Sequence, residues 1–208
     1  MQYETEQERF WAGEFGNDYT NRNSQDLLLR SKLIRLQRIL SRTNSVNSIV
    51  ELGCNRGLNL QALKLLNDAF KLEGYEINTS AAQKAKELNI ADIFCGTITQ
   101  EIANNKKFDL AFTSGVLIHI HPDKLHEVYK NLVALSRRYI LIIEYYNPTP
   151  IEVTYRGHGE RLFKRDFAGE LIDTYNLDLI DYGFSYRREK LMMNDDSSWF
   201  LLEKRCLQ

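Results

Sequence analysis

The chain has 208 residues, of which 43% are hydrophobic and 26% are charged, a composition that favours one globular domain with a substantial core. Its 27 basic and 28 acidic side chains nearly cancel, whereas a general nucleic-acid binder would show an excess or a stripe of basic residues. No apolar run approaches the roughly 20 residues that a membrane-spanning helix needs. We therefore expect neither nucleic acid nor a membrane as a partner.

Three cysteines, Cys54, Cys95 and Cys206, lie far apart and show no spacing typical of a metal site, so no metal is expected. The first residues are acidic and polar, which differs from the basic and then apolar pattern of a secretion signal. An odd number of cysteines without an export signal favours reduced thiols and a cytoplasmic location.

Residues 1–45 are predicted to form an N-terminal arm and a helix that belong to the same domain as residues 46–208. The helix is expected at about residues 24–40, where leucines recur at helical spacing. The preceding segment, residues 10–23, is rich in aromatic and polar side chains. We expect it to be a lid that excludes water from a binding site.

From residue 46 onward, short apolar runs alternate with helical patterns, as in a parallel α/β sheet. Five successive strands are predicted at residues 48–52, 71–77, 91–95, 108–114 and 139–146. The clearest helix precedes the fifth strand, because apolar residues from Leu125 to Leu135 recur every three to four positions. Pro122 suits the first turn of that helix, where a missing amide hydrogen costs little.

The fifth strand is followed by a polar loop at 147–162, a helix near 164–175, and two strands at about 177–186 and 197–205. Because no helix separates the last two strands, they should pair as a hairpin. The prediction is therefore a Rossmann-like α/β fold with a seven-stranded, mostly parallel sheet and an antiparallel last strand.

A binding turn is expected directly after the first strand, which ends at Glu51. Gly53 and Gly57 allow the backbone to turn tightly and to approach a ligand closely, and Asn55 tolerates a left-handed conformation. Glu76 ends the second strand, where an acidic side chain can accept hydrogen bonds from both hydroxyls of a ribose.

This ordered set, ELGCNRG at 51–57, Glu76 and FDLAFTSGVLIHI at 108–120, resembles the class I S-adenosylmethionine (SAM)-dependent methyltransferases. The resemblance implies the class I methyltransferase fold and SAM as cofactor. The cofactor-binding residues that it implies are Glu51, Gly53, Cys54, Asn55, Gly57, Glu76, Ile77, Gly96, Thr97 and Ser114. An NAD-binding domain is the alternative, but Asn55 breaks the G-x-G-x-x-G pattern and no phosphate-binding cluster follows.

Two catalytic residues are expected. His119 follows the fourth strand and has an ordinary pKa suited to a general base, although it could instead only pack against the cofactor. Tyr19 in the arm could stack on the adenine or face the sulfonium, since an aromatic ring favours positive charge.

Acceptor-binding residues are expected in the arm and after the fifth strand. The segment after that strand carries aromatic residues and a cluster of cations that suit a carboxylate or a phosphate, although such a cluster can also be a solvated face. The predicted acceptor-binding residues are Arg22, Tyr146, Asn147, Arg156 and His158.

The arm, the glycine turn, YYNPTP at 145–150 and YRGHGERLFKRDFAGEL at 155–171 together resemble the pseudaminic acid biosynthesis-associated methylases. That resemblance implies methylation of a small acceptor, an anionic or nucleotide-linked sugar of nonulosonic acid synthesis. It leaves open whether oxygen or nitrogen is methylated, and the oligomeric state. The alternatives are methylation of a peptide or protein side chain, and a catalytically silent module that binds SAM.

Overall fold

The structure is a computed structural model that describes every residue except 1–2, 22–24, 104, 158, 191–194 and 206–208. A single large sheet carries seven strands in the order β3-β2-β1-β4-β5-β9-β8. Their bounds are β1 Ser48–Leu52, β2 Lys71–Glu76, β3 Asp92–Cys95, β4 Phe108–Ser114, β5 Ser136–Glu144, β8 Leu177–Ser185 and β9 Ser197–Lys204. The first five strands run parallel, and β9 is antiparallel to both β5 and β8. The predicted sheet is confirmed.

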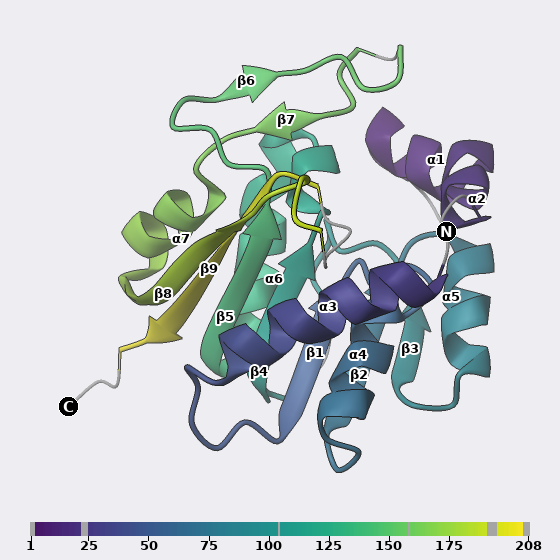
Figure 1. Cartoon of the computed structure of the whole chain (residues 1–208). Coiled ribbons are helices and arrows are strands. Elements are labelled where there is room, and N and C mark those ends of the chain that lie inside the picture. The colour runs from purple at the N-terminus through teal and green to yellow at the C-terminus, as the bar shows by residue number, and fades with distance from the viewer. Residues whose placement is uncertain (1–2, 22–24, 104, 158, 191–194, 206–208) are drawn as a thin grey trace.

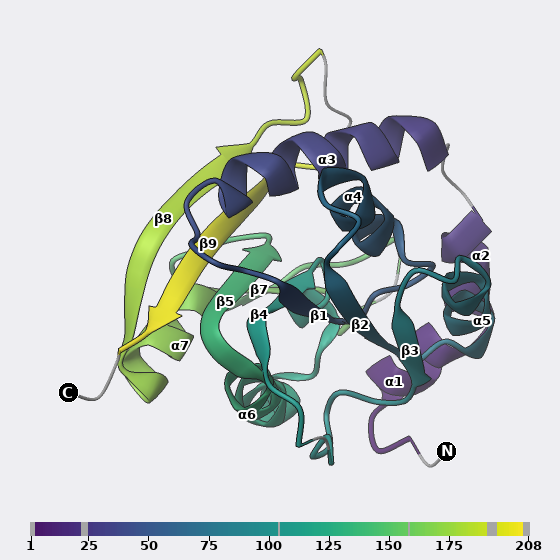
Figure 2. The ribbon, with the colours of Figure 1, turned by 90° about the horizontal axis from the view of Figure 1, so that it is seen from below.

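Helices cover both faces of this sheet (Figures 1 and 2). The helices α3 Gln25–Leu40, α4 Leu58–Leu66 and α5 Thr79–Glu87 pack on one face, where Leu36 and Leu60 are fully buried in a common apolar core. The helices α6 Leu125–Leu135 and α7 Phe167–Tyr175 cover the other face, with Leu132 and Leu171 fully buried. Each such leucine stabilises the fold by roughly 1.5–3 kcal/mol.

The N-terminal arm is helical and forms α1 Glu6–Ala12 and α2 Glu14–Asn21. A capping box starts α1, in which the Thr5 side chain accepts from the Glu8 amide and Glu8 accepts from the Thr5 amide. Figure 1 places both helices at the end of the sheet toward which β4 and β5 point.

The segment predicted as a polar loop contains a strand that the sequence did not reveal. A small antiparallel hairpin pairs β6 Ile151–Glu152 with β7 Phe163–Lys164. The following helix begins at Phe167 rather than near residue 164, because the Asp166 carboxylate caps it by accepting from the Gly169 amide. Across the part of the chain that is described, no helix is long and apolar enough to cross a membrane.

Candidate active site

A cavity of about 590 Å³ lies at the carboxyl ends of the parallel strands, where α/β sheets bind their ligands. Its walls come from the turns after β1, β2, β3, β4 and β5, and its cover comes from α1 and α2. Nine of the ten predicted cofactor-binding residues line it: Glu51, Gly53, Cys54, Asn55, Glu76, Ile77, Gly96, Thr97 and Ser114. Sequence reasoning therefore located this side of the cavity.

The turn after β1 requires its left-handed residues for different reasons. Gly53 has φ +81°, and a Cβ there would lie 2.5 Å from the Val116 side chain. Gly57 has φ +79° and starts α4, but a Cβ there would meet Leu88 of the neighbouring segment at 3.0 Å. Gly57 is not among the lining residues, and its left-handed conformation shapes the turn at the start of α4. Asn55, with φ +47°, takes the left-handed position predicted for it.

Glu76 is buried at the end of β2 and joins that strand to the glycine turn. One carboxylate oxygen accepts from the Asn55 amide at 2.7 Å, and the other accepts from the Asn78 amide at 2.8 Å. Burial raises the pKa of Glu76, while these amides act in the opposite direction. The carboxylate keeps acceptor capacity beyond these backbone hydrogen bonds, because its two oxygens offer about four lone-pair sites, as a ribose-binding carboxylate requires.

Glu51 is buried at the end of β1, with only one of its oxygens satisfied. Oε1 accepts from Asn59 Nδ2 at 2.5 Å, and Oε2 has no hydrogen-bond partner among the described residues. Burial raises the pKa of Glu51 to about 7. A buried carboxylate oxygen without a donor is costly, which points to a ligand that supplies one.

The turn after β3 forms the wall next to Glu76 and also holds the cover. Thr97 and Thr99 both donate their hydroxyls to one carboxylate oxygen of Glu8 in α1, the second at 2.6 Å. A Cβ on Gly96 would meet no atom within 4 Å, so this wall is open to a ligand. The Thr97 side chain is occupied by the cover, which leaves its backbone and Gly96 to face the cavity.

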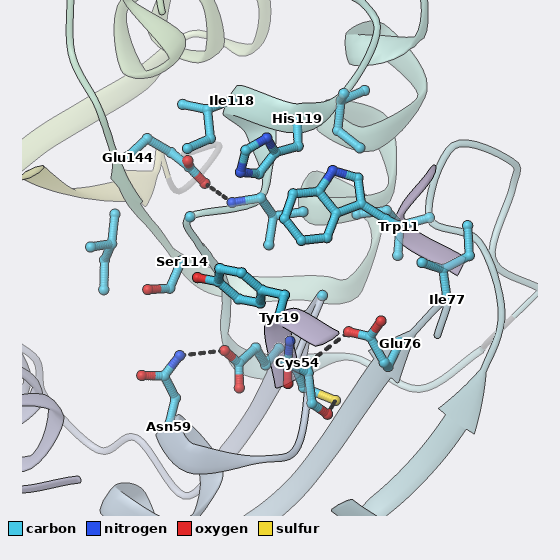
Figure 3. Close-up of a pocket in the computed structure, with 18 of the residues that line it drawn as sticks. Trp11, Tyr19, Cys54, Asn59, Glu76, Ile77, Ser114, Ile118, His119 and Glu144 are labelled. Atoms are coloured by element: carbon cyan, nitrogen blue, oxygen red, sulfur yellow. Dashed lines mark hydrogen bonds between the residues drawn. The ribbon is translucent and has the colours of Figure 1, made fainter. Parts of the chain in front are cut away.

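The cover is also anchored to the start of α5. The Asn78 side chain donates through Nδ2 to the Trp11 carbonyl at 3.1 Å and to Asn17 Oδ1 at 3.0 Å. The Trp11 ring meets the Tyr19 ring edge to face, with 5.3 Å between ring centroids. Both rings line the cavity (Figure 3). Trp11 Nε1 is buried without a hydrogen-bond partner among the described residues.

His119 lies beside Trp11, with 4.4 Å between ring centroids (Figure 3). The His119 ring also faces the Tyr155 ring, with 5.1 Å between their centroids. Its Nδ1 is 2.7 Å from the Arg161 carbonyl oxygen, which can only accept, so Nδ1 carries the proton. Burial lowers the pKa of His119 to about 4, and the ring is therefore neutral near pH 7. Its Nε2 keeps a lone pair that can accept a proton or a hydrogen bond.

The predicted acceptor residues separate in the structure. Arg156 lines the cavity from the hairpin side, with φ +51° and its guanidinium 5.7 Å from the Tyr155 ring centroid. Tyr146 and Asn147 do not line it. Side chains alternate along an extended chain, so Tyr145 faces the cavity while Tyr146 lies 44% exposed on the other side, near Phe200.

Asn147 donates its side-chain amide to the Thr149 carbonyl at 2.6 Å and stays at the surface. The structure therefore does not bring Tyr146 or Asn147 together with the other predicted residues. Arg22 and His158 lie outside the described residues.

Sequence reasoning missed several polar residues that the fold brings to this cavity. They are Glu8, Lys32, Arg35, Asn59 and Glu144. Glu144 ends β5 and accepts from the Val116 and Leu117 amides at 2.9 and 3.0 Å, which holds the turn after β4 in place. Burial raises the pKa of Glu144 to about 7. Lys32 and Arg35 are three positions apart in a predicted helix, so the sequence indicates that they lie on the same helix face. It does not indicate that this face reaches the cavity.

Several solved structures share this fold at low sequence identity. An S-adenosylmethionine-dependent methyltransferase from Clostridium acetobutylicum ATCC 824 is 12% identical, with 91% of this chain and 97% of that chain covered and a TM-score of 0.65. The magnesium protoporphyrin IX methyltransferase from Synechocystis PCC 6803, solved with bound SAM, is 11% identical, with 99% and 100% covered and a TM-score of 0.66. The plantazolicin methyltransferase, solved with SAH, is 14% identical, with 96% and 94% covered and a TM-score of 0.65. No curated protein matches the sequence.

The strand order, the antiparallel β9 and these likenesses define a Rossmann-like methyltransferase fold of class I. A family model described as "Methyltransferase domain" matches residues 26–181, three-quarters of the chain. The chain belongs to this methyltransferase family.

Proposed function

We propose that this protein transfers the methyl group of SAM to an oxygen or nitrogen atom of a small acceptor. The observation that carries the proposal is one covered cavity that joins the glycine turn and Glu76 to the unprotonated Nε2 of His119. SAM, when bound, supplies a methyl group already activated on a sulfonium, so the protein's task is to align the acceptor and handle its proton.

The residues at the cofactor end fit SAM. Glu76 suits the ribose hydroxyls, the open wall at Gly96 suits the adenine, and the unpartnered Oε2 of Glu51 suits the ammonium of the methionyl group. Tyr19 and Trp11 offer aromatic rings to the positive sulfonium. His119 Nε2 would accept a hydrogen bond from the acceptor and take its proton during transfer.

For the acceptor we propose an anionic or nucleotide-linked sugar of nonulosonic acid synthesis. The likeness of the flanking segments to the pseudaminic acid-associated methylases supports this class, and so does the Arg156 guanidinium beside the cavity. The solved neighbours include methyltransferases of plantazolicin and of magnesium protoporphyrin IX, so the fold by itself does not select an acceptor.

Methylation of a peptide or protein side chain is the second candidate, and it would need an open groove at the acceptor end. Here α1 and α2 cover the cavity and are held at both Glu8 and Asn78. This closure favours a small acceptor over a polypeptide. It also disfavours a silent SAM-binding module, because such a module has no need of a covered acceptor space beside His119.

A methyl-transfer screen tests the proposed function. The protein would be incubated with methyl-labelled SAM and, separately, with sugar intermediates of nonulosonic synthesis and with unstructured peptides. We expect a mass gain of one labelled methyl on a sugar and none on the peptides. Labelled peptides would favour the second candidate, and labelled product from neither set would favour the silent module.

We expect the Arg156→Ala variant to raise the acceptor's KM by about tenfold, with little change in kcat, because a charge-assisted hydrogen bond to an anionic acceptor contributes roughly 1.5–3 kcal/mol. Steady-state kinetics with the acceptor from the screen measures this. Arg30→Ala is the matched control, since Arg30 is an exposed arginine that does not line the cavity. An unchanged KM in Arg156→Ala would assign Arg156 to the solvated surface.

We further propose that α1 and α2 act as a lid, with Glu8 as its main anchor. One Glu8 oxygen caps α1 by accepting from the Glu4 and Thr5 amides, while the other accepts from Thr97 and Thr99. Burial raises the pKa of Glu8, but these hydrogen bonds outweigh burial and lower it below the usual value. Glu8 is therefore ionised near neutral pH and serves both α1 and the β3 turn.

Accordingly, Glu8→Ala should increase amide hydrogen exchange across residues 3–21 by about tenfold or more, while the exchange of β1 and β4 stays as in the wild type. The matched control is Asp18→Ala, which removes an exposed carboxylate from the same segment. If Glu8→Ala leaves exchange in residues 3–21 unchanged, Glu8 is not the anchor of the lid.

A further inference from the structure

Arg35 is a buried cation that forms no ion pair within 4 Å among the described residues, although the carboxylates of Glu51, Glu144 and Asp195 attract it from a greater distance. Its side chain extends from α3 to the cavity wall, the residue is 8% exposed, and Nη2 is 3.5 Å from the Ser114 hydroxyl. Among the described residues, its Nε has no hydrogen-bond partner and no carboxylate lies within 4 Å of its guanidinium. Burying an unpaired charge is costly. This arrangement points to an anion supplied by a ligand.

Lys32 lies one helical turn before Arg35 and faces the same wall. Its ammonium donates to Asn59 Oδ1 at 3.0 Å, and Asn59 Nδ2 donates in turn to Glu51. Asn59 thus holds the ammonium apart from the carboxylate, with no direct ion pair within 4 Å among the described residues. Burial lowers the pKa of Lys32 to about 8, which keeps most of its charge at neutral pH.

This end of the cavity therefore offers two cations from α3 and, across Asn59, a carboxylate oxygen without a donor. Such a pattern is complementary to a free α-amino acid group, which carries an ammonium and a carboxylate on one carbon. We infer that Arg35, assisted by Lys32, binds the carboxylate of the cofactor's methionyl end, while Glu51 binds its ammonium. The inference rests on the proposed use of SAM.

A carboxylate on the acceptor is the other source of the same chemistry. The position of the two cations favours the cofactor, because Lys32 is tied through Asn59 to Glu51 and Arg35 contacts Ser114. Asn59 lies in the first turn of α4 and Ser114 ends β4, so neither contact involves the hairpin that carries Arg156. An experiment on cofactor binding alone separates the two sources.

The test compares two ligands by calorimetry without any acceptor: S-adenosylhomocysteine, which keeps the amino acid group, and 5′-methylthioadenosine, which lacks it. We expect the wild type to bind S-adenosylhomocysteine at least 100-fold more tightly. Arg35→Gln should weaken the binding of S-adenosylhomocysteine by about 10- to 100-fold and leave the affinity for methylthioadenosine unchanged, because only the first ligand reaches Arg35. Lys32→Gln should show the same selective loss to a smaller extent, and Arg35→Lys should recover part of the affinity.

Arg38→Gln is the matched control, because Arg38 is on the same helix but lies over the Trp199 ring, outside the cavity. Unchanged S-adenosylhomocysteine affinity in Arg35→Gln would overturn the inference, and with a raised acceptor KM it would assign Arg35 to the acceptor. An equal loss of affinity for both ligands in Arg35→Gln would also overturn the inference and leave Arg35 with a structural role. A wild type that binds neither ligand would overturn the use of SAM itself, whereas equal wild-type affinities would overturn only the carboxylate contact.

Discussion

Replacing Glu76 with alanine is expected to weaken SAM binding on the order of 100-fold. The ribose would lose two charge-assisted hydrogen bonds to this carboxylate, each contributing roughly 1.5–3 kcal/mol before the site relaxes. The Glu76 carboxylate also accepts hydrogen bonds from the backbone amides of Asn55 and Asn78. Its removal therefore loosens the glycine turn as well as the ribose contact. Isothermal calorimetry with SAM measures the loss directly.

Two further variants separate the ribose contact from the folding of the turn. Glu76→Gln keeps the size of the side chain and one acceptor oxygen, so its affinity should lie between those of the wild type and of Glu76→Ala. Glu87→Gln, an exposed site on α5, should bind SAM as the wild type does. If a folded Glu76→Ala protein binds SAM with wild-type affinity, Glu76 does not contact the ribose.

Replacing His119 with alanine is expected to lower kcat by about 100-fold or more, with the Kd for SAM almost unchanged. The neutral ring donates through Nδ1 to the Arg161 carbonyl, which directs the Nε2 lone pair away from that bond. His119→Gln retains size and polarity but has no comparable base, so its kcat should also be low. Nearly wild-type turnover in His119→Ala would leave His119 only its packing against Trp11 and Tyr155.

The pH dependence of this reaction follows from the direction of the His119 pKa shift. Burial lowers the pKa to about 4, and catalysis needs the unprotonated ring. Activity that depends on His119 is therefore retained throughout the ordinary histidine range and is lost only as the pH falls through about 4. A kcat profile with no histidine limb between pH 5.5 and 7.5 is the expected result, and a limb centred near 6.5 would contradict the buried neutral ring.

The elements and the cofactor turn were predictable because their signals are local. Alternation and helical spacing locate β1 to β5 and the closing hairpin, and Gly53, Asn55 and Glu76 occupy positions that backbone conformation and strand ends dictate. Contacts between neighbouring strand ends in a parallel sheet follow from topology, which explains why most of the predicted cofactor residues line one cavity.

The remaining polar residues depend on tertiary contacts that no local pattern encodes. Lys32 and Arg35 look like ordinary polar positions beside a leucine stripe until α3 packs across α4 and the ends of β1 and β4. Glu8 reads as part of a capping box, and its second role at the β3 turn appears only when α1 folds over the cavity. Tyr146 lies outside the cavity because strand alternation gives Tyr145 the inward position.

A crystal structure of the protein with bound S-adenosylhomocysteine tests the central claim most directly. We expect the ribose hydroxyls on Glu76, the methionyl group between Glu51 and Arg35, and the thioether sulfur directed toward the space beside His119 and Tyr19. A ligand whose ribose lies away from Glu76, or whose sulfur points away from His119 into solvent, would contradict the account of this cavity as the site of methyl transfer.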